Sequence, residues 1–273
     1  MKPLIDADIL TYECAFGGQD RETGEAYSFE YVSALIDKKI NEICQAVGAT
    51  QPPLLLLTGK DNFRFDIATV KPYKGNRKQP KPFHYRNARA YFESLGAVVV
   101  DGMEADDMLA IKQMEDYWMF FGSKDNAKQH SRACKTVICT RDKDLRQVQG
   151  WHYGWEHGLQ PEYPLTFVDE IGSLELTDKN KLKGTGLKFF YSQIITGDVT
   201  DNIPGLPNKG PVYAYKLLSD TNTEGDMLNA VISAYTEFYG DAWEEHLLEQ
   251  GRLVWMIREL DEEGRPVMWK IPS

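Results

Sequence analysis

The sequence has few cysteines and no long apolar run, and each shortage excludes a class of protein. Its 4 cysteines, Cys14, Cys44, Cys134 and Cys139, contain no CxxC pair, so neither a zinc ribbon nor a disulfide framework is indicated. Apolar runs such as Leu54–Leu57 fall far short of the roughly 20 residues that a spanning helix needs. The N-terminus carries aspartates where a signal peptide would be apolar. We therefore expect reduced thiols and a cytoplasmic protein that is not bound to a membrane.

What the sequence does contain is the composition of a globular protein. It is 42% hydrophobic, 12% aromatic and 26% charged, which excludes disordered and fibrous classes. A chain of 273 residues can bury most of its apolar surface without disulfides. Its length allows one large domain, or a core domain with a smaller appendage.

The charge of the chain is unevenly distributed. A net charge of −10 at first argues against nucleic acid, because phosphate backbones attract basic proteins. Residues 67–92, however, contain no acid and seven bases: Lys71, Lys74, Arg77, Lys78, Lys81, Arg86 and Arg89. This stretch is either a phosphate-binding surface or a solvated basic face.

Apolar patterns predict strands that alternate with helices. We expect strands over Lys2–Asp6, Leu54–Thr58, Ala97–Asp101 and Thr136–Thr140, and helices over Phe29–Val47, His84–Leu95 and Glu104–Phe121. Such alternation predicts an α/β fold with a mostly parallel sheet flanked by helices. Helices over Phe189–Ile195 and Val212–Leu218 begin a helical region. We therefore divide the chain into residues 1–165, a core containing the basic segment at about 67–95, and residues 166–273.

Acidic residues gather where predicted strands end and in one later turn. They are Asp6, Asp8, Asp61, Glu104, Asp106, Asp107, Asp142, Asp144, Asp198 and Asp201. Ligands of open parallel sheets bind outside the carboxyl ends of the strands. Carboxylates that converge there need cations to neutralise them. Oxygen ligands select Mg²⁺ or Mn²⁺, and the five histidines form no HExxH pair, so the sequence predicts a carboxylate-only metal site.

Each acidic cluster also has a structural interpretation when it is taken alone. Glu104, Asp106 and Asp107 would suit the positive end of a helix. Asp142 or Asp144 could cap a short helix, and Asp198 and Asp201 could be turn residues. Several clusters at strand ends and in one turn favour the metal site over these separate explanations.

Five segments, taken in order, resemble the 5′-nuclease superfamily of flap endonucleases and phage 5′→3′ exonucleases. They are LIDADIL (4–10), YKGNR (73–77), GMEADDMLA (102–110), CTRDKDL (139–145) and GDVTDNIPGL (197–206). The resemblance implies a PIN-like α/β core with two divalent ions, Mg²⁺ or Mn²⁺. It places one metal group on Asp6, Glu104, Asp106 and Asp107, and a second on Asp142, Asp144, Asp198 and Asp201. Asp61 and Asp8 are further candidate ligands.

The same resemblance assigns DNA contacts. Lys74 and Arg77 would be catalytic, contacting the scissile phosphate, while Tyr73 would stack on a terminal base. Lys78, Lys81 and Arg86 would belong to a basic helical arch that admits a single-stranded 5′ end. IPGLPNKGPVYAYKLL (203–218) resembles the family's helix-three-turn-helix, which grips duplex DNA and can bind K⁺. Gly205, Lys209 and Gly210 would contact DNA there, although Asn208 and Lys209 interrupt the usual glycine pattern.

The resemblance thus implies a metal-dependent 5′→3′ exonuclease or flap endonuclease that cleaves duplex DNA by a two-metal-ion mechanism. The expected substrates have a 5′ end, a nick or a flap, with an RNA–DNA hybrid as a further candidate. A monomeric phage enzyme of DNA replication, primer removal or repair, located in the host cytoplasm, would fit this reading.

Three other functions remain open. The Asp6–Asp8 pair also resembles the opening motif of haloacid-dehalogenase-type phosphatases, although the basic stretch would then have no purpose. A catalytically inactive DNA-binding protein would explain the basic residues but not the clustered acids. A small PIN-type ribonuclease would leave the helix-three-turn-helix segment at 203–218 unexplained.

Overall fold

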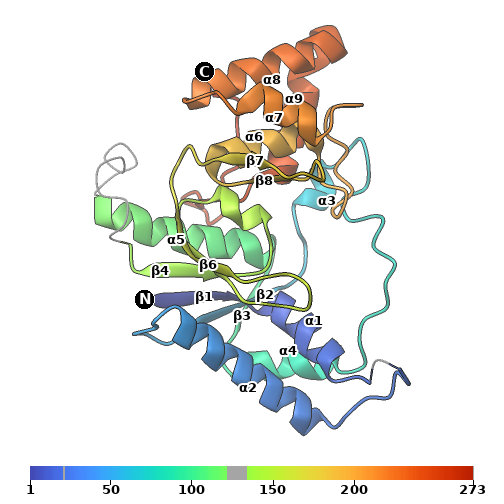
Figure 1. The fold of residues 1–273 in the computed structure, drawn as a ribbon, viewed down its shortest axis with the longest axis vertical. Helices are drawn as coiled ribbons and strands as arrows, with labels where there is room; N and C mark the ends of the chain where they lie inside the picture. The colour runs from blue at the N-terminus through green and yellow to red at the C-terminus, as the bar shows by residue number, and fades with distance from the viewer. Residues whose placement is uncertain (21, 122–133, 273) are drawn as a thin grey trace. The chain divides into compact units, whose positions relative to one another are not determined.

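The computed structural model describes residues 1–20, 22–121 and 134–272, with the side chains of residues 120 and 121 excepted. The chain forms two compact units, traced in Figure 1. Unit 1 comprises Met1–Asp61, Lys78–Lys143 and Gly150–Phe167. Unit 2 takes up the chain from Val168, close to the predicted division after residue 165, and also includes Asn62–Arg77 and Asp144–Gln149.

A six-stranded sheet forms the centre of unit 1, in the order β3-β2-β1-β4-β5-β6. Register pairs such as Leu4 with Leu54 and Leu4 with Ile138 show that β1 is parallel to both neighbours. The pairs β2–β3 and β4–β5 are also parallel, which confirms the predicted sheet. The strands are β1 (Lys2–Asp6), β2 (Leu54–Thr58), β3 (Val98–Val100), β4 (Thr136–Cys139), β5 (Gly150–Gly154) and β6 (Tyr163–Val168).

Helices cover both faces of this sheet, as Figure 1 shows. Alternating side chains explain the two layers, because successive residues of a strand point to opposite faces. Ile5 belongs to the buried cluster of the face covered by α1, α2 and α4, whereas its neighbour Leu4 lies outside that cluster. The helices are α1 (Ala7–Gly17), α2 (Phe29–Ala46) and α4 (Tyr85–Ser94) on one side and α5 (Ala105–Phe121) on the other.

The basic segment is less helical than predicted. Only the short α3 (Arg64–Ile67) and α4 flank it, and residues 68–84 form turns and irregular backbone. Pro72, Pro80 and Pro82 explain the difference, since proline lacks the backbone donor and clashes with the preceding helical turn. The predicted helical arch at about 67–95 is therefore a helix only over its last third.

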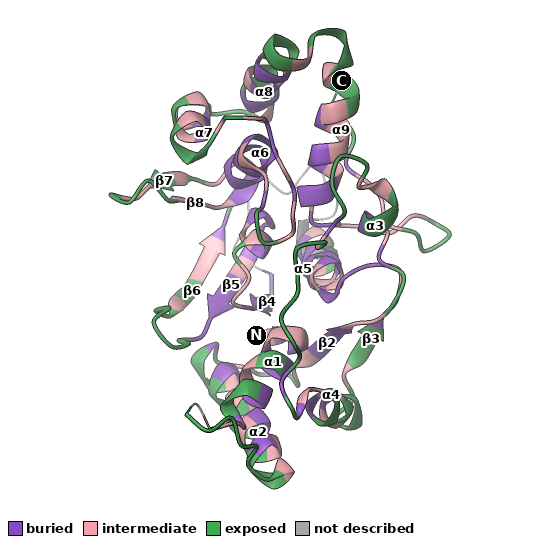
Figure 2. Cartoon of the chain, turned by 90° about the vertical axis from the view of Figure 1, so that its right-hand side faces the viewer, coloured by how far each residue is buried: buried purple, intermediate pink, exposed green. Residues whose placement is uncertain are grey.

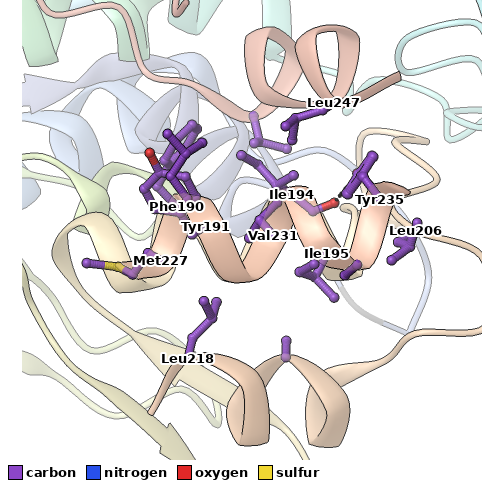
Figure 3. Packing of buried hydrophobic residues seen from close by; sticks show 14 of the residues in the cluster. Phe190, Tyr191, Ile194, Ile195, Leu206, Leu218, Met227, Val231, Tyr235 and Leu247 are labelled. Atoms are coloured by element: carbon purple, nitrogen blue, oxygen red, sulfur yellow. Dashed lines mark hydrogen bonds between the residues drawn. The ribbon is translucent and has the colours of Figure 1, made fainter. Parts of the chain in front are cut away.

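Unit 2 is built around α6 (Gly186–Thr196), which is buried along nearly its whole length. Figure 3 shows Phe190, Tyr191 and Ile194 among apolar side chains of the surrounding helices, and Figure 2 shows the same helix as buried. The surrounding elements are the hairpin β7 (Leu174–Leu176) and β8 (Leu182–Gly184), α7 (Pro211–Leu218), α8 (Glu224–Tyr239), the 3₁₀ helix η3 (Gly240–Ala242) and α9 (Trp243–Val254). This confirms the helical region predicted after residue 165.

Buried side chains fix the two early segments to unit 2. The Arg64 guanidinium, 1% exposed, donates from Nε to Leu253 O at 3.1 Å and from Nη2 to Trp255 O at 2.7 Å. The 3₁₀ helix η2 (Asp144–Gln147) packs against α6. Sequence periodicity could not reveal these attachments, because they join residues far apart in the chain. Among the described helices, none is both long and apolar enough to cross a membrane.

Candidate metal and nucleic-acid site

Asp6 is the most deeply buried of the predicted ligands that follow β1. It is 2% exposed, its Oδ1 accepts the Ile9 amide at 3.1 Å and caps α1, and its Oδ2 accepts the Thr140 hydroxyl at 2.8 Å. Burial, followed by the charge of Asp8, raises the pKa of Asp6 from 3.8 to about 7. The site thus holds a carboxylate whose negative charge is costly without a nearby cation.

Asp8 lies beside Asp6 but already has a basic partner. Its Oδ2 accepts the Thr58 amide at 2.8 Å, and its Oδ1 lies 3.4 Å from Arg89 Nη1. Burial raises the pKa of Asp8, and the charge of Glu104 adds to the shift. The ion pair with Arg89 makes Asp8 a supporting carboxylate of the cluster.

The second acidic segment forms the start of α5. Glu104 is 9% exposed and Asp107 is fully buried. Asp107 Oδ2 accepts the Glu104 amide at 3.2 Å, which is the return bond of a capping box. Thr58 Oγ1 accepts the Ala105 amide at 2.9 Å and joins this helix start to the end of β2. Asp107 therefore has the structural role of stabilising the start of a helix. Asp106, the next ligand candidate, is only partly buried.

Asp142 is the predicted metal ligand of unit 1 that follows β4. Its amide donates to Thr140 Oγ1 at 3.0 Å, so one hydroxyl links the backbone of Asp142 to the carboxylate of Asp6. The negative charge of Asp142 contributes to the raised pKa of Asp6. Asp61, the other candidate, is exposed and has φ of 61°.

The donor chemistry of this cluster fits a hard divalent cation. Its acids are oxygen donors at strand ends, and burial leaves their repulsion poorly screened. Within the described residues, no three or more His, Cys, Asp or Glu side chains are already arranged as a ligand set. A cation would therefore have to draw other carboxylates of the cluster toward Asp6 by rotamer changes, and the candidates are Glu104, Asp106, Asp107 and Asp142.

Unit 2 holds the other predicted ligands, beginning with the 198–201 turn. Asp198, 7% exposed, accepts the amides of Thr200 at 2.7 Å and Asp201 at 3.3 Å through Oδ1. This is an Asx turn, so the structural interpretation of Asp198 is realised as well. Gly197 precedes it with φ of 67°.

Asp201 joins the turn to the basic segment. Its Oδ1 accepts Arg77 Nη2 at 2.5 Å, its Oδ2 accepts the Tyr73 hydroxyl at 2.9 Å, and Lys74 Nζ lies 3.8 Å away. Lys74 also donates its amide to Asp201 O at 2.8 Å and has φ of 54°, an uncommon conformation for a side-chain-bearing residue. The structure thus joins three predicted site residues in one network of hydrogen bonds and ion pairs. Lys74 and Arg77 are the predicted phosphate contacts, and Asp201 is a predicted metal ligand.

Tyr73 has a different environment from the one predicted. Its ring is 4% exposed and packs in the apolar cluster of unit 2, with Phe65 at an edge-to-face centroid distance of 5.6 Å. A ring held in this core is not presented to a terminal base. Its hydroxyl instead orients Asp201.

Asp144 begins η2 and is held from α6. Gln193 Nε2 donates to Asp144 Oδ1 at 2.7 Å, and Gln193 is 4% exposed. Of the predicted second metal group, Asp142 thus belongs to unit 1, whereas Asp144, Asp198 and Asp201 belong to unit 2.

The two glycines of the predicted duplex-binding hairpin differ in role. Gly205 has φ of 64°, a Cβ there would collide with the backbone of Gly197, and its buried amide donates to Gln250 Oε1 at 3.0 Å. Its amide is therefore committed to the fold, contrary to the predicted phosphate contact. Gly210 is exposed with φ of −105°, and a Cβ there would meet nothing within 4 Å. Asn208 has φ of 59°, the left-handed conformation that glycine often supplies.

The remaining predicted DNA contacts carry accessible charge. Lys78, Lys81 and Arg86 are exposed in unit 1, and Lys81 Nζ lies 4.1 Å from the centroid of the Tyr85 ring. Lys209 Nζ lies 4.3 Å from the centroid of the Tyr213 ring in unit 2. These side chains suit phosphate contacts that depend on charge and exposure.

Sequence reasoning missed the uncharged residues that orient the acids. Thr58 and Thr140 end or follow strands, and Gln193 lies on α6. The first two had a signal, because both apolar strand patterns, LLLLT and TVICT, end in a hydroxyl residue beside acids. Gln193 had none, since its partner is 49 residues away.

Comparison with known proteins agrees with this description of the fold. No protein-family model matches the chain. DNA polymerase I of Bacillus subtilis is 26% identical over 279 residues, covering 94% of this chain and 27% of the polymerase. The chain thus spans about a quarter of the length of the curated relative it matches.

Solved structures of bacteriophage T5 proteins share the fold. A T5 flap endonuclease in complex with DNA and metal ions has a TM-score of 0.57 at 14% identity, covering 92% of this chain and 88% of that one. A T5 5′-exonuclease with bound divalent zinc has a TM-score of 0.56 at 16% identity, covering 93% and 88%. These likenesses confirm the predicted α/β fold and the predicted resemblance to 5′-nucleases.

Proposed function

We propose that this protein is a metal-dependent 5′→3′ exonuclease and flap endonuclease acting on duplex DNA. The observation that carries the proposal is the buried carboxylate cluster around Asp6 at the strand ends of a 5′-nuclease fold. Clustered acids of this kind are stable as anions only when cations neutralise them. The T5 proteins of the same fold were solved with metal ions, and one of them with DNA.

Two divalent ions would be held by the carboxylates already described. Asp6, Glu104, Asp106 and Asp107, all in unit 1, would serve one ion, and Asp144, Asp198 and Asp201, all in unit 2, would serve the other. Bound Mg²⁺ or Mn²⁺ supplies an activated water and neutralises charge on a phosphodiester. The chain itself contributes preset oxygen donors, because Thr140 and the Ile9 amide fix the rotamer of Asp6.

Lys74 and Arg77 would bind the scissile phosphate. Both now contact Asp201, so their charges are held close together before a substrate arrives. A phosphate that binds here would contact two positively charged side chains that already lie close together. The negative charge that develops on the phosphate during cleavage would strengthen these contacts. Tyr73 would keep Asp201 oriented while the bases turn toward the substrate.

Duplex DNA would be bound by the hairpin before α7 and by the exposed bases. Gly210 leaves room for a phosphate to approach the backbone, and Lys209 adds a positive charge beside it. Lys78, Lys81 and Arg86 would guide a 5′ end or flap. A K⁺ site in the hairpin is a further candidate, because Asn208 adopts the backbone conformation that a glycine would supply.

The decisive experiment is digestion of 5′- and 3′-labelled duplex, nicked and flapped DNA with Mg²⁺ or EDTA. We expect release of short products from the 5′ side in Mg²⁺ only, and an RNA–DNA hybrid in the same series would define tolerance of RNA. Undiminished cleavage in EDTA would contradict the metal mechanism. Hydrolysis of a small phosphomonoester without cleavage of DNA would favour the phosphatase alternative instead. DNA binding without cleavage in any metal would favour the inactive DNA-binding protein.

A further inference from the structure

Two buried glutamines of unit 2, Gln193 and Gln147, are linked to Asp144 by successive side-chain hydrogen bonds. Gln193, on α6, donates its Nε2 to Asp144 Oδ1 at 2.7 Å. Gln147, at the end of η2, places its Nε2 3.4 Å from Gln193 Oε1. Their exposed fractions are 4% and 0%, so neither amide can exchange these partners for bulk water. The three side chains form one line of contacts from α9 to Asp144.

Backbone groups at the end of α9 fix the orientation of the Gln147 amide. The Met256 N–H can only donate, and it donates to Gln147 Oε1 at 3.1 Å. The Val254 carbonyl can only accept, and it accepts from Gln147 Nε2 at 2.9 Å. A reversed amide would set oxygen against oxygen and nitrogen against nitrogen, each leaving a buried group without its bond. Arg258 Nη2 donates to Gln147 O at 2.9 Å and holds the backbone as well.

This orientation carries through to Gln193. Because Gln147 presents a donor to Gln193, the oxygen of Gln193 faces Gln147 and its nitrogen faces Asp144. The group that Gln193 presents to Asp144 Oδ1 is therefore an N–H donor. A donor at this distance holds the Asp144 side chain in one rotamer. Carboxylates that ligate metals are commonly oriented by such partners.

We propose that Gln147 and Gln193 form a relay that positions the Asp144 side chain for a divalent cation. The inference rests on the proposed function, because it takes Asp144 as a metal ligand. Both glutamines are positioning residues: they act through Asp144 and touch neither cation nor DNA. The Val254 carbonyl and the Met256 N–H determine which way the Gln147 amide faces, and through Gln193 they determine that a donor faces the carboxylate.

Two substitutions of Gln193 separate the donor from the shape of the side chain. Gln193→Glu keeps the size but sets an acceptor and a negative charge against Asp144. Gln193→Met keeps a similar volume and removes the donor without adding charge. Binding of Mn²⁺ to the DNA-free protein, followed by calorimetry, is the readout. We expect the affinity of one ion to fall about 10–100-fold in Gln193→Glu, and less in Gln193→Met.

Tyr235→Phe is the matched control. The hydroxyl of Tyr235, on α8, donates to Ile194 O, on α6, at 2.8 Å, so its loss removes a buried hydrogen bond to the residue that follows Gln193. Figure 3 labels both residues. This variant should unfold at a lower temperature but bind Mn²⁺ as the wild type does. A fall in Mn²⁺ affinity equal to that of Gln193→Met would show that any loosening of α6 weakens the metal, and would overturn the relay.

Kinetics and a double variant complete the test. In single-turnover cleavage, Gln193→Met should need more Mg²⁺ for half the maximal rate but approach the wild-type plateau. In an Asp144→Asn background, Gln193→Met should cause no further loss of Mn²⁺ affinity, because the relay acts through that carboxylate. Wild-type protein that binds no divalent ion would overturn the proposed function itself. Wild-type binding with unchanged affinity in both folded Gln193 variants would overturn only the relay.

Discussion

At the scale of single residues, the burial of Asp6 has the largest physical consequence. A carboxyl group whose pKa rises from 3.8 to about 7 on folding binds a proton that the unfolded chain has already released. Without metal, the contribution of Asp6 to folding stability should therefore fall as pH rises from about 4 to about 7, because this group binds more protons in the native state there. A bound cation would offset this loss by stabilising the anion.

Asp6→Asn tests that consequence. Asparagine can still cap α1 through its one amide oxygen, and its NH₂ group can donate to Thr140 Oγ1 where Asp6 accepted from that hydroxyl, but it carries no charge. In EDTA at pH 8, we expect the variant to be more stable than the wild type by on the order of 4 kcal/mol, since each pKa unit between 3.8 and about 7 corresponds to about 1.4 kcal/mol. Thermal melts at pH 4 and pH 8 measure this difference, which should be much smaller at pH 4.

The same melts contain their control. Addition of Mg²⁺ at pH 8 should stabilise the wild type and leave Asp6→Asn nearly unchanged, because the variant lacks a ligand. A variant that is less stable than the wild type in EDTA at both pH values would contradict the electrostatic account of this site.

Lys74 offers a second test at the same scale. Its Nζ lies 3.8 Å from Asp201, and its proposed contact with the scissile phosphate strengthens as charge develops during cleavage. Lys74→Ala should therefore lower the single-turnover rate by about 10²–10³-fold while DNA affinity in Ca²⁺ falls much less. Equal small losses of rate and affinity would reduce Lys74 to a general electrostatic contact.

At the scale of elements, the segment before α7, residues 203–210, contains two glycines, Gly205 and Gly210. The sequence predicts a DNA contact for both, but the structure gives them different roles. Gly210→Val should fold, because a Cβ at this position meets nothing within 4 Å, although the altered helix cap costs roughly 1 kcal/mol. The variant should bind duplex DNA about tenfold more weakly yet still cleave single strands slowly with metal. Filter binding and gel assays of both substrates measure the two effects.

Gly205→Ala is the structural counterpart. Its left-handed backbone and the nearby Gly197 backbone leave no room for a methyl group, so this variant should lose stability whether or not DNA is present. Equal loss of single-strand and duplex cleavage in folded Gly210→Val would refute the division of labour between hairpin and carboxylates.

The elements themselves were largely predictable from the sequence. Strand β2, over Leu54–Thr58, was predicted at its observed bounds, because its apolar run follows two prolines and ends at a polar residue. The strand ends in turn located the acids. The hairpin β7–β8 was missed, since its short strands, LEL and LKG, carry a glutamate and a lysine that resemble a loop. Its apolar residues, Leu174 and Leu182, pack only against a core assembled from distant segments.

The site was predictable in residue type and less so in contacts. Acids at strand ends require only the alternation of strands and helices. The burial of Tyr73 and the commitment of the Gly205 amide depend on partners such as Asp201 and Gln250, which lie 128 and 45 residues away. No local pattern encodes such contacts, so they appeared only in the folded chain.

At the scale of the whole molecule, a protein of net charge −10 must bind a polyanion through a local excess of bases. Residues 67–92 supply that excess, and Lys78 and Lys81 are exposed within it. If they contact phosphates, each contributes about 0.9 to the slope of log affinity against log salt. The remaining acids repel DNA, and this repulsion also weakens as salt rises. The phosphate contacts of Lys78 and Lys81 can therefore be isolated only by comparing variants.

The double variant Lys78→Ala with Lys81→Ala is therefore paired with Lys38→Ala and Lys112→Ala. The control changes the net charge equally, but Lys38 and Lys112 already pair with Glu42 at 3.7 Å and with Glu115 at 2.8 Å. We expect the first variant to reduce the salt slope for duplex binding in Ca²⁺ by about two units and the control by far less. Anisotropy titrations across a range of KCl concentrations give both slopes. Equal changes in the two variants would mean that net charge alone governs binding, and that the basic stretch is a solvated face.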